Sequence, residues 1–171
     1  MTKNGYHKLV QKFNGRRQLV EKMTYDVEGH LVMNAFKYAR LLNKYDERGN
    51  LTEVNTFDEK GQLSEVHYGY ARMSMKYDAR GNLVEEAYFG ADGRPKILSE
   101  YYCARQTYKY DAEGNQVEYA CFGTENVLYD ELLGYARVIR KFDSRRRVIE
   151  ERYFDSADKP SRISDNGQHI T

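Results

Sequence analysis

A glutamate recurs at the same place in five successive stretches of this chain. This regular row of carboxylates is the feature of the sequence best suited to binding or catalytic chemistry. A row of this kind could bind cations. Each carboxylate could instead pair with the recurrent arginine or lysine of an adjacent unit, or accept hydrogen bonds from backbone groups or tyrosine hydroxyls, because an unpaired buried charge costs several kcal/mol. The sequence leaves these interpretations open for Glu21, Glu53, Glu85, Glu118 and Glu150.

Other side chains with catalytic or ligand-binding chemistry are sparse and badly spaced for a site. The four histidines, His7, His30, His67 and His169, show no metal-ligand spacing. The sequence contains no Cys-x-x-Cys, no His-Glu-x-x-His, no Gly-x-Ser-x-Gly and no phosphate-binding glycine loop before a helix. We therefore predict no catalytic residue, no metal site and no cofactor.

The elements that must position these residues come from an internal repeat of about 32 residues, the signature of an array whose units stack on one another. Aromatic residues that open a turn are separated by 12 and 20 residues in alternation, with a single gap of 21. The pattern predicts one repeat domain over 1–171. Its units are 5–36, 37–68, 69–100, 101–133 and 134–165, and 166–171 is the remnant of a further unit. The fourth unit has one inserted residue, taken as Cys103, which leaves Tyr102 in the recurrent tyrosine row.

The local patterns of each unit predict β-hairpins. Asp78-Ala79-Arg80-Gly81-Asn82 has the aspartate and glycine expected of a three-residue hairpin loop with a bulge, and a second, looser turn follows twelve residues later. Gly69 and Gly134 are expected at bends where one strand passes to the next. No helical apolar stripe is present. The predicted fold is all-β: tandem antiparallel β-hairpin repeats that form a solenoid-like or spiralling β strip of five units.

The turn residues also predict a strand register. If Asp78 lies opposite Asn82, simple alternation places Glu85 on the apolar face with Met75, and sets Glu86 opposite Ser74 on the other face. In this register Cys103 and Cys121 lie diagonally on neighbouring strands, so we expect free buried thiols in preference to a disulfide.

Composition narrows the classes of partner. With 27 basic and 26 acidic residues the net charge is +1, which gives no electrostatic reason to expect nucleic-acid binding. No apolar run approaches the ~20 residues that span a bilayer, and the first residues contain no signal peptide. The cellular compartment stays open. Unpaired edge strands favour an edge-to-edge homo-oligomer.

The motifs Tyr45-Asp46-Glu47-Arg48-Gly49-Asn50, Tyr77-Asp78-Ala79-Arg80-Gly81-Asn82 and Tyr110-Asp111-Ala112-Glu113-Gly114-Asn115 resemble the Tyr-Asp (YD, or Rhs-type) repeats of bacterial proteins. The resemblance implies a long antiparallel β strip with structural or binding roles and no catalysis. This chain differs from the family pattern in its alternating 12 and 20 spacing and in its Gly-Tyr-Ala-Arg segment. A weaker similarity links residues 87–93 to hairpins of bacterial cell-wall-binding repeats, whose sugar sites use tryptophan, a residue absent here.

These observations favour a non-enzymatic structural or protein-interaction module, a segment of a larger bacterial repeat protein. The expected partners are another protein or flanking repeats of the parent chain. The alternative is a glycan-binding module in which sugars stack on regularly spaced tyrosines. Because tyrosine and arginine dominate many interfaces, the candidate binding surface consists of Tyr38, Tyr70, Tyr135, Arg40, Arg72 and Arg137. Packing of one repeat against the next is an equally well supported role for the same rows of tyrosine and arginine.

Overall fold

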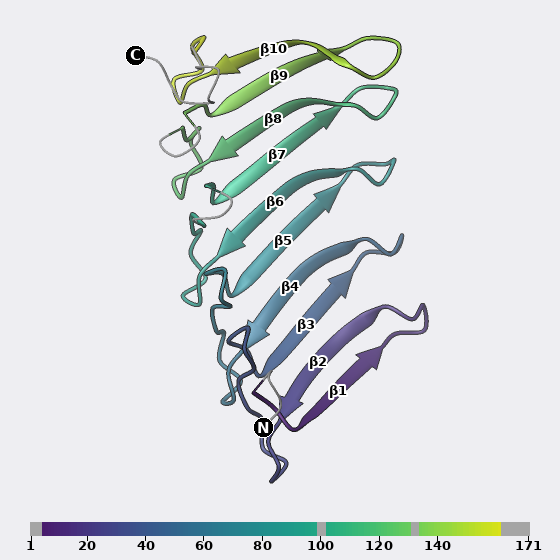
Figure 1. The fold of residues 1–171 in the computed structure, drawn as a ribbon, viewed down its shortest axis with the longest axis vertical. Coiled ribbons are helices and arrows are strands. Elements are labelled where there is room, and N and C mark those ends of the chain that lie inside the picture. The colour runs from purple at the N-terminus through teal and green to yellow at the C-terminus, as the bar shows by residue number, and fades with distance from the viewer. Residues whose placement is uncertain (1–4, 99–101, 131–133, 162–171) are drawn as a thin grey trace. The chain divides into compact units, whose positions relative to one another are not determined.

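The computed structural model describes residues 5–98, 102–130 and 134–161, and these form ten antiparallel strands and no helix (Figure 1). The prediction of an all-β chain built from tandem hairpins is confirmed. The strands are β1 (Lys8–Phe13), β2 (Leu19–Tyr25), β3 (Arg40–Tyr45), β4 (Leu51–Phe57), β5 (Arg72–Tyr77), β6 (Leu83–Phe89), β7 (Arg105–Tyr110), β8 (Gln116–Phe122), β9 (Arg137–Phe142) and β10 (Val148–Phe154).

The chain divides into two compact units. Unit 1 contains residues 1–75 and 88–94, and unit 2 contains residues 76–87 and 95–171. In unit 1 β1 pairs with β2, β2 with β3, β3 with β4 and β4 with β5, all antiparallel. In unit 2 the same succession runs from β6 to β10. Each hairpin therefore pairs with the next hairpin in the chain.

The Tyr-Asp motif builds the tight turn of the second, third and fourth hairpins through the aspartate side chain. Asp46 Oδ1 accepts hydrogen bonds from the backbone N–H groups of Arg48 (3.0 Å) and Asn50 (2.8 Å), and Asn50 Nδ2 donates to Asp46 Oδ2 (2.9 Å). Gly49 has a φ of 94°, a left-handed conformation that residues with a Cβ rarely adopt. The backbone N–H of Asp46 donates to the Asn50 carbonyl, so the predicted turn is confirmed.

A β-bulge directly after this turn shifts the register, and here the simple alternation predicted from the sequence is wrong. In β3–β4 Tyr45 lies opposite Leu51, but Lys44 lies opposite Glu53, so one residue of β4 has no partner. The hairpin β7–β8 has the same shift. The aspartate and glycine of the turn indicate a bulge, but the predicted register continues strict alternation past it. The prediction therefore places the recurrent glutamates one position out of register. As a result, Glu85 pairs with Lys76 at 2.7 Å.

Each unit of the repeat passes to the next through a bend in the left-handed conformation. Gly69 has a φ of 95°, and its N–H donates to the Val66 carbonyl at 2.8 Å, which confirms the predicted glycine bend. In the second and fourth repeats the corresponding residues are Lys37 and Tyr102, with φ values of 66° and 59°. A side chain is strained in this conformation, so these two bends carry a cost that glycine avoids.

The alanine that follows this bend shows that Cys103 is not the inserted residue of the fourth repeat. The N–H of Ala104 donates to the Phe122 carbonyl at 2.9 Å, as Ala71 donates to Phe89, also at 2.9 Å. Cys103 therefore takes the position of the recurrent tyrosine, Tyr102 takes that of the bend glycine, and the extra residue precedes Tyr102. Gap counting could not locate it, because an insertion on either side of Tyr102 gives the same gap.

The recurrent alanines are the most completely buried residues of the repeat. Ala39, Ala71, Ala104 and Ala136 are at most 1% exposed. A larger side chain in so completely buried a position would overpack its surroundings, which explains why this small residue recurs.

Candidate functional site

The bulge aligns the recurrent lysine and glutamate of each hairpin directly across from one another. The ammonium and carboxylate groups are 2.6 to 2.8 Å apart in all five hairpins. The pairs are Lys12–Glu21, Lys44–Glu53, Lys76–Glu85, Lys109–Glu118 and Lys141–Glu150.

Three of these glutamates, Glu21, Glu85 and Glu118, also contact the arginine of the following hairpin. Glu21 accepts from Arg40 Nε at 2.6 Å, in addition to its pair with Lys12. In unit 2 Arg105 lies 3.2 Å from Glu85 and Arg137 lies 3.8 Å from Glu118. We call this Lys–Glu–Arg arrangement the ion cluster. Because its arginine comes from the next hairpin, the ion cluster joins successive repeats.

Each arginine of the ion cluster also lies over the aromatic ring that closes its own hairpin. The guanidinium carbons of Arg72, Arg105 and Arg137 lie 3.8 to 4.2 Å from the ring centroids of Phe89, Phe122 and Phe154, while Arg40 lies 5.7 Å from the ring centroid of Phe57. Cation–π contacts of this type are worth ~0.5 to 2 kcal/mol. Arg40, Arg105 and Arg137 therefore have both a carboxylate and a ring as partners, and all four arginines are half-buried.

The electrostatics favour ionised glutamates. Hydrogen bonds from Lys12, and then from Arg40, lower the pKa of Glu21, although its burial acts in the opposite direction. For Glu53 burial is the largest single influence and raises the pKa, but hydrogen bonds from Lys44 and Asn55 together outweigh it and the net pKa is lowered. The carboxylates thus have protein cations as partners, and a bound metal ion would have to displace them.

The six residues of the predicted binding surface fall into two different environments. Arg40, Arg72 and Arg137 stack on phenylalanines, as described above. Tyr38 is 6% exposed. The half-buried rings of Tyr70 and Tyr135 contact Tyr88 and Tyr153, with centroid distances of 5.9 and 5.0 Å. The structure thus brings these tyrosines to a position that packs against the second strand of the same hairpin.

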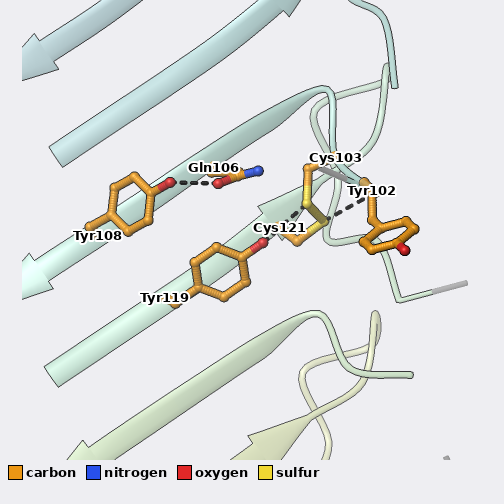
Figure 2. Close-up of a disulfide and its surroundings, with 6 residues drawn as sticks. All are labelled: Tyr102, Cys103, Gln106, Tyr108, Tyr119 and Cys121. Atoms are coloured by element: carbon orange, nitrogen blue, oxygen red, sulfur yellow. Dashed lines mark hydrogen bonds between the residues drawn. A yellow bond between two sulfur atoms is a disulfide. The ribbon is translucent and has the colours of Figure 1, made fainter. Parts of the chain in front are cut away.

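In the fourth repeat two cysteines occupy this packing position, and they form a disulfide (Figure 2). Cys103 and Cys121 have a Cα–Cα distance of 5.5 Å. The expectation of free thiols is wrong, since it rested on the register without the bulge and on Cys103 as the insertion. Once Cys103 takes the tyrosine position, it faces Cys121 as Tyr70 faces Tyr88.

Tyrosine rings follow one another across unit 2 beside this disulfide. Centroid distances are 5.8 Å from Tyr108 to Tyr119, 6.5 Å from Tyr119 to Tyr135 and 5.0 Å from Tyr135 to Tyr153. The hydroxyl of Tyr119 lies 3.3 Å from Cys103 Sγ, and Figure 2 shows it pointing toward the sulfur pair. Burial raises the pKa of Tyr119. For Tyr153, burial and a hydrogen bond to Glu151 raise the pKa to about 12.

Among the described residues, the one group of three side chains arranged as potential metal ligands lies in the turn after β2. Asp26, Glu28 and His30 approach one another there, with Glu28 and His30 exposed. The Asp26 carboxylate already accepts backbone hydrogen bonds from Glu28 and His30 at 2.9 Å each. The aspartate therefore shapes the turn, as Asp58 and Asp155 do at the same position of the second and fifth repeats.

Sequence reasoning missed one surface feature, a hollow in unit 1 lined by Lys22, Phe36, Tyr38 and Tyr70 among others. The exposure of Phe36 could have been found from the repeat, because Phe36 and Tyr68 occupy the same position 32 residues apart. Within the part of the chain that the structure describes, no helix is long and apolar enough to cross a membrane.

No family model and no curated protein matches this sequence. Solved structures give weak similarities to toxin-complex chains. The crystal structure of TcdB2-TccC3-TEV aligns at a TM-score of 0.40 and 8% identity, over 99% of this chain and 9% of that one. TcdB2-TccC3-Cdc42 aligns at 0.34 and 17%, over 94% of this chain and 8% of that one. The Photorhabdus luminescens Tc holotoxin pore aligns at 0.31 and 17%, with the same coverage. The chain spans less than a tenth of the length of these chains.

Proposed function

We propose that this chain is a non-enzymatic structural repeat segment of a larger protein, of the Tyr-Asp type, which holds or displays protein partners. The observation that carries the proposal is the ion cluster. The glutamate of one hairpin contacts the arginine of the next, so the most regular charged residues of the chain are used to join repeats.

The distribution of chemistry along the chain supports a role without catalysis. An active site needs one constellation that differs from its surroundings, whereas the lysine–glutamate pair recurs at nearly the same distance in all five hairpins. The aspartates of the Tyr-Asp motifs are likewise used within their own turns. A turnover activity that disappears in a Glu85→Gln variant would contradict this part of the proposal.

Glycan binding is the alternative function raised by the tyrosine row. Sugar stacking needs ring faces open to solvent. Tyr38 is buried, and Tyr70 and Tyr135 pack against other tyrosines. These contacts favour the structural use of the row over the glycan-binding use.

The proposal is tested by deleting one whole repeat, residues 37–68. In a structural array the shortened chain keeps its register, so it should fold into the same β structure with lower stability. A matched control deletes residues 37–52, half a repeat, which leaves β4 without β3. We expect far-UV circular dichroism and thermal melting to show a cooperative fold for the first variant and not for the second. Loss of folding in both variants would contradict a modular array.

A further inference from the structure

Unit 1 contains a hollow of about 230 Å³. Three repeats contribute residues to it, and most of the side chains are apolar or aromatic. They include Phe36, Tyr38, Leu41, Val66, Tyr68 and Tyr70. We call it the aromatic hollow.

Two of its aromatic residues are open to solvent although the strands beside them are packed. Phe36 is 53% exposed and Tyr68 is 41% exposed. They follow each other at one repeat distance, so successive repeats each contribute one exposed ring. Large exposed rings at the rim of a concave apolar surface are typical of interaction sites.

Lys22 gives the aromatic hollow a positive charge. Its ammonium lies 5.8 Å from the centroid of the Tyr38 ring. Lys22 also lines a second hollow of about 150 Å³, beside Tyr6, Asn34 and Phe36. Within residues 5–98, 102–130 and 134–161, no carboxylate lies at ion-pair distance from Lys22, in contrast to the lysines of the ion cluster.

This cation is specific to the first repeat. The residues at the same position in the later repeats are Val54, Glu86, Tyr119 and Glu151. Because the ion cluster needs no charge at this position, Lys22 is not explained by the architecture common to all repeats. Lys22 therefore distinguishes the aromatic hollow from the equivalent positions of the later repeats.

We propose that the aromatic hollow binds a protein partner through an aromatic side chain of that partner with a carboxylate beside it. The ring would enter beside the exposed rings of Phe36 and Tyr68, and the carboxylate would pair with Lys22. The hollow is smaller than the roughly 300 to 1,000 Å³ of typical small-molecule sites, which suits a single anchoring side chain. This inference rests on the proposed role in holding protein partners.

The lining favours a protein side chain over an acidic sugar. Leu41 and Val66 contribute aliphatic surface, whereas a sugar would bring hydroxyl groups that lose their water without gaining hydrogen-bond partners. Burial of an aromatic side chain against the same surface makes the free energy of binding more favourable.

The test is an NMR titration of the full chain with a minimal probe, N-acetylphenylalanine, which carries both the ring and the carboxylate. N-acetylphenylalaninamide is the matched control, since it keeps the ring and removes the charge. We expect the acid to shift the signals of Tyr38 and Tyr70 and to bind at least about fivefold more tightly than the amide, because the ion pair at the rim is partly desolvated. Lys22→Gln should abolish this preference, and Phe36→Ala should weaken both probes. Lys60→Gln, a change at an exposed turn lysine of the same unit, should change neither.

Equal affinity for acid and amide in the unaltered chain would overturn the proposal, as would an acid preference that survives in the Lys22→Gln variant. Stronger binding of glucuronic acid than of N-acetylphenylalanine would overturn it in favour of an acidic glycan. Absence of any shift at millimolar probe would also overturn it. Circular dichroism of each variant verifies its folding. The repeat-deletion experiment involves no ligand. A failure of ligand binding at the aromatic hollow can therefore be distinguished from a failure of the proposed structural role.

Discussion

Units 1 and 2 use the same repeat differently at one position. In unit 1 the recurrent tyrosine Tyr38 faces Thr56, a smaller residue, and the aromatic hollow lies beside them. In unit 2 Cys103 and Cys121 occupy the corresponding pair of positions and close it covalently. The ion cluster, by contrast, is present in both units with nearly the same lysine–glutamate distances. The lysine–glutamate pair is therefore the fixed part of the repeat, whereas the tyrosine position carries either a tyrosine ring or half of a cross-link.

The largest expected effect comes from removing the cross-link. The disulfide closes a loop with a sequence separation of 18, and constraining the unfolded chain over such a loop is worth ~3 kcal/mol. We expect the double variant Cys103→Ser with Cys121→Ser to lose about that much stability in urea unfolding under oxidising conditions. A reductant should lower the stability of the unaltered chain and leave the double variant unchanged. Identical unfolding midpoints for the unaltered chain with and without reductant would contradict a structural disulfide.

The next effect tests the ion cluster in both units. Glu21→Gln should destabilise by ~1 to 3 kcal/mol, because it leaves Lys12 and Arg40 without their carboxylate. Glu118→Gln should cost less, because Arg137 keeps Asp158 as a partner at 2.8 Å. Glu150→Gln is the matched control. Its carboxylate is more exposed, and it pairs with Lys141 and with Arg152 of its own strand. We expect a loss below ~1 kcal/mol there. A cost at Glu150 as large as at Glu21 would show that joining successive hairpins is not what matters.

Acid should affect Glu21 in a defined direction. Its pKa is lowered in the folded chain, chiefly by the hydrogen bond from Lys12, so its contribution to stability is present above its unfolded pKa of about 4.3. That contribution disappears as the pH falls through the lower, folded pKa. The stability difference between the unaltered chain and Glu21→Gln should therefore be constant at neutral pH and shrink below about pH 4.3. Urea unfolding at a series of pH values measures it. A stability difference that grows on acidification would contradict a lowered pKa of Glu21 in the folded chain.

The smallest expected effect concerns the rim of the aromatic hollow. Phe36→Ala and Tyr68→Ala remove exposed rings, so each should change stability by less than ~0.5 kcal/mol. Thermal melting of the two variants measures this. A large loss of stability in either would mean that the rings are needed for folding, and the surface would then not be free for a partner.

The sequence predicted the all-β class, the repeat and the tight turns, because these depend on local residues such as Asp78, Gly81 and Asn82. It did not predict the partner of each glutamate, because one bulge residue after the turn changes the pairing of the rest of the strand. The same error concealed the disulfide. The aromatic hollow could not be predicted, since it combines Lys22, Tyr38 and Tyr70 from three repeats whose spacing in the structure the sequence does not give. That no carboxylate among the described residues lies at ion-pair distance from Lys22 is likewise a property of the folded chain.

The most direct test of the central claim, that the ion cluster joins successive repeats, is a double-mutant cycle between Glu21 and Arg40. The two side chains belong to neighbouring hairpins and lie 2.6 Å apart. The cycle uses Glu21→Gln, Arg40→Gln and the double variant, with the free energy of unfolding measured in urea for each. We predict a favourable coupling energy of ~1 to 2 kcal/mol. A coupling energy indistinguishable from zero would contradict the claim.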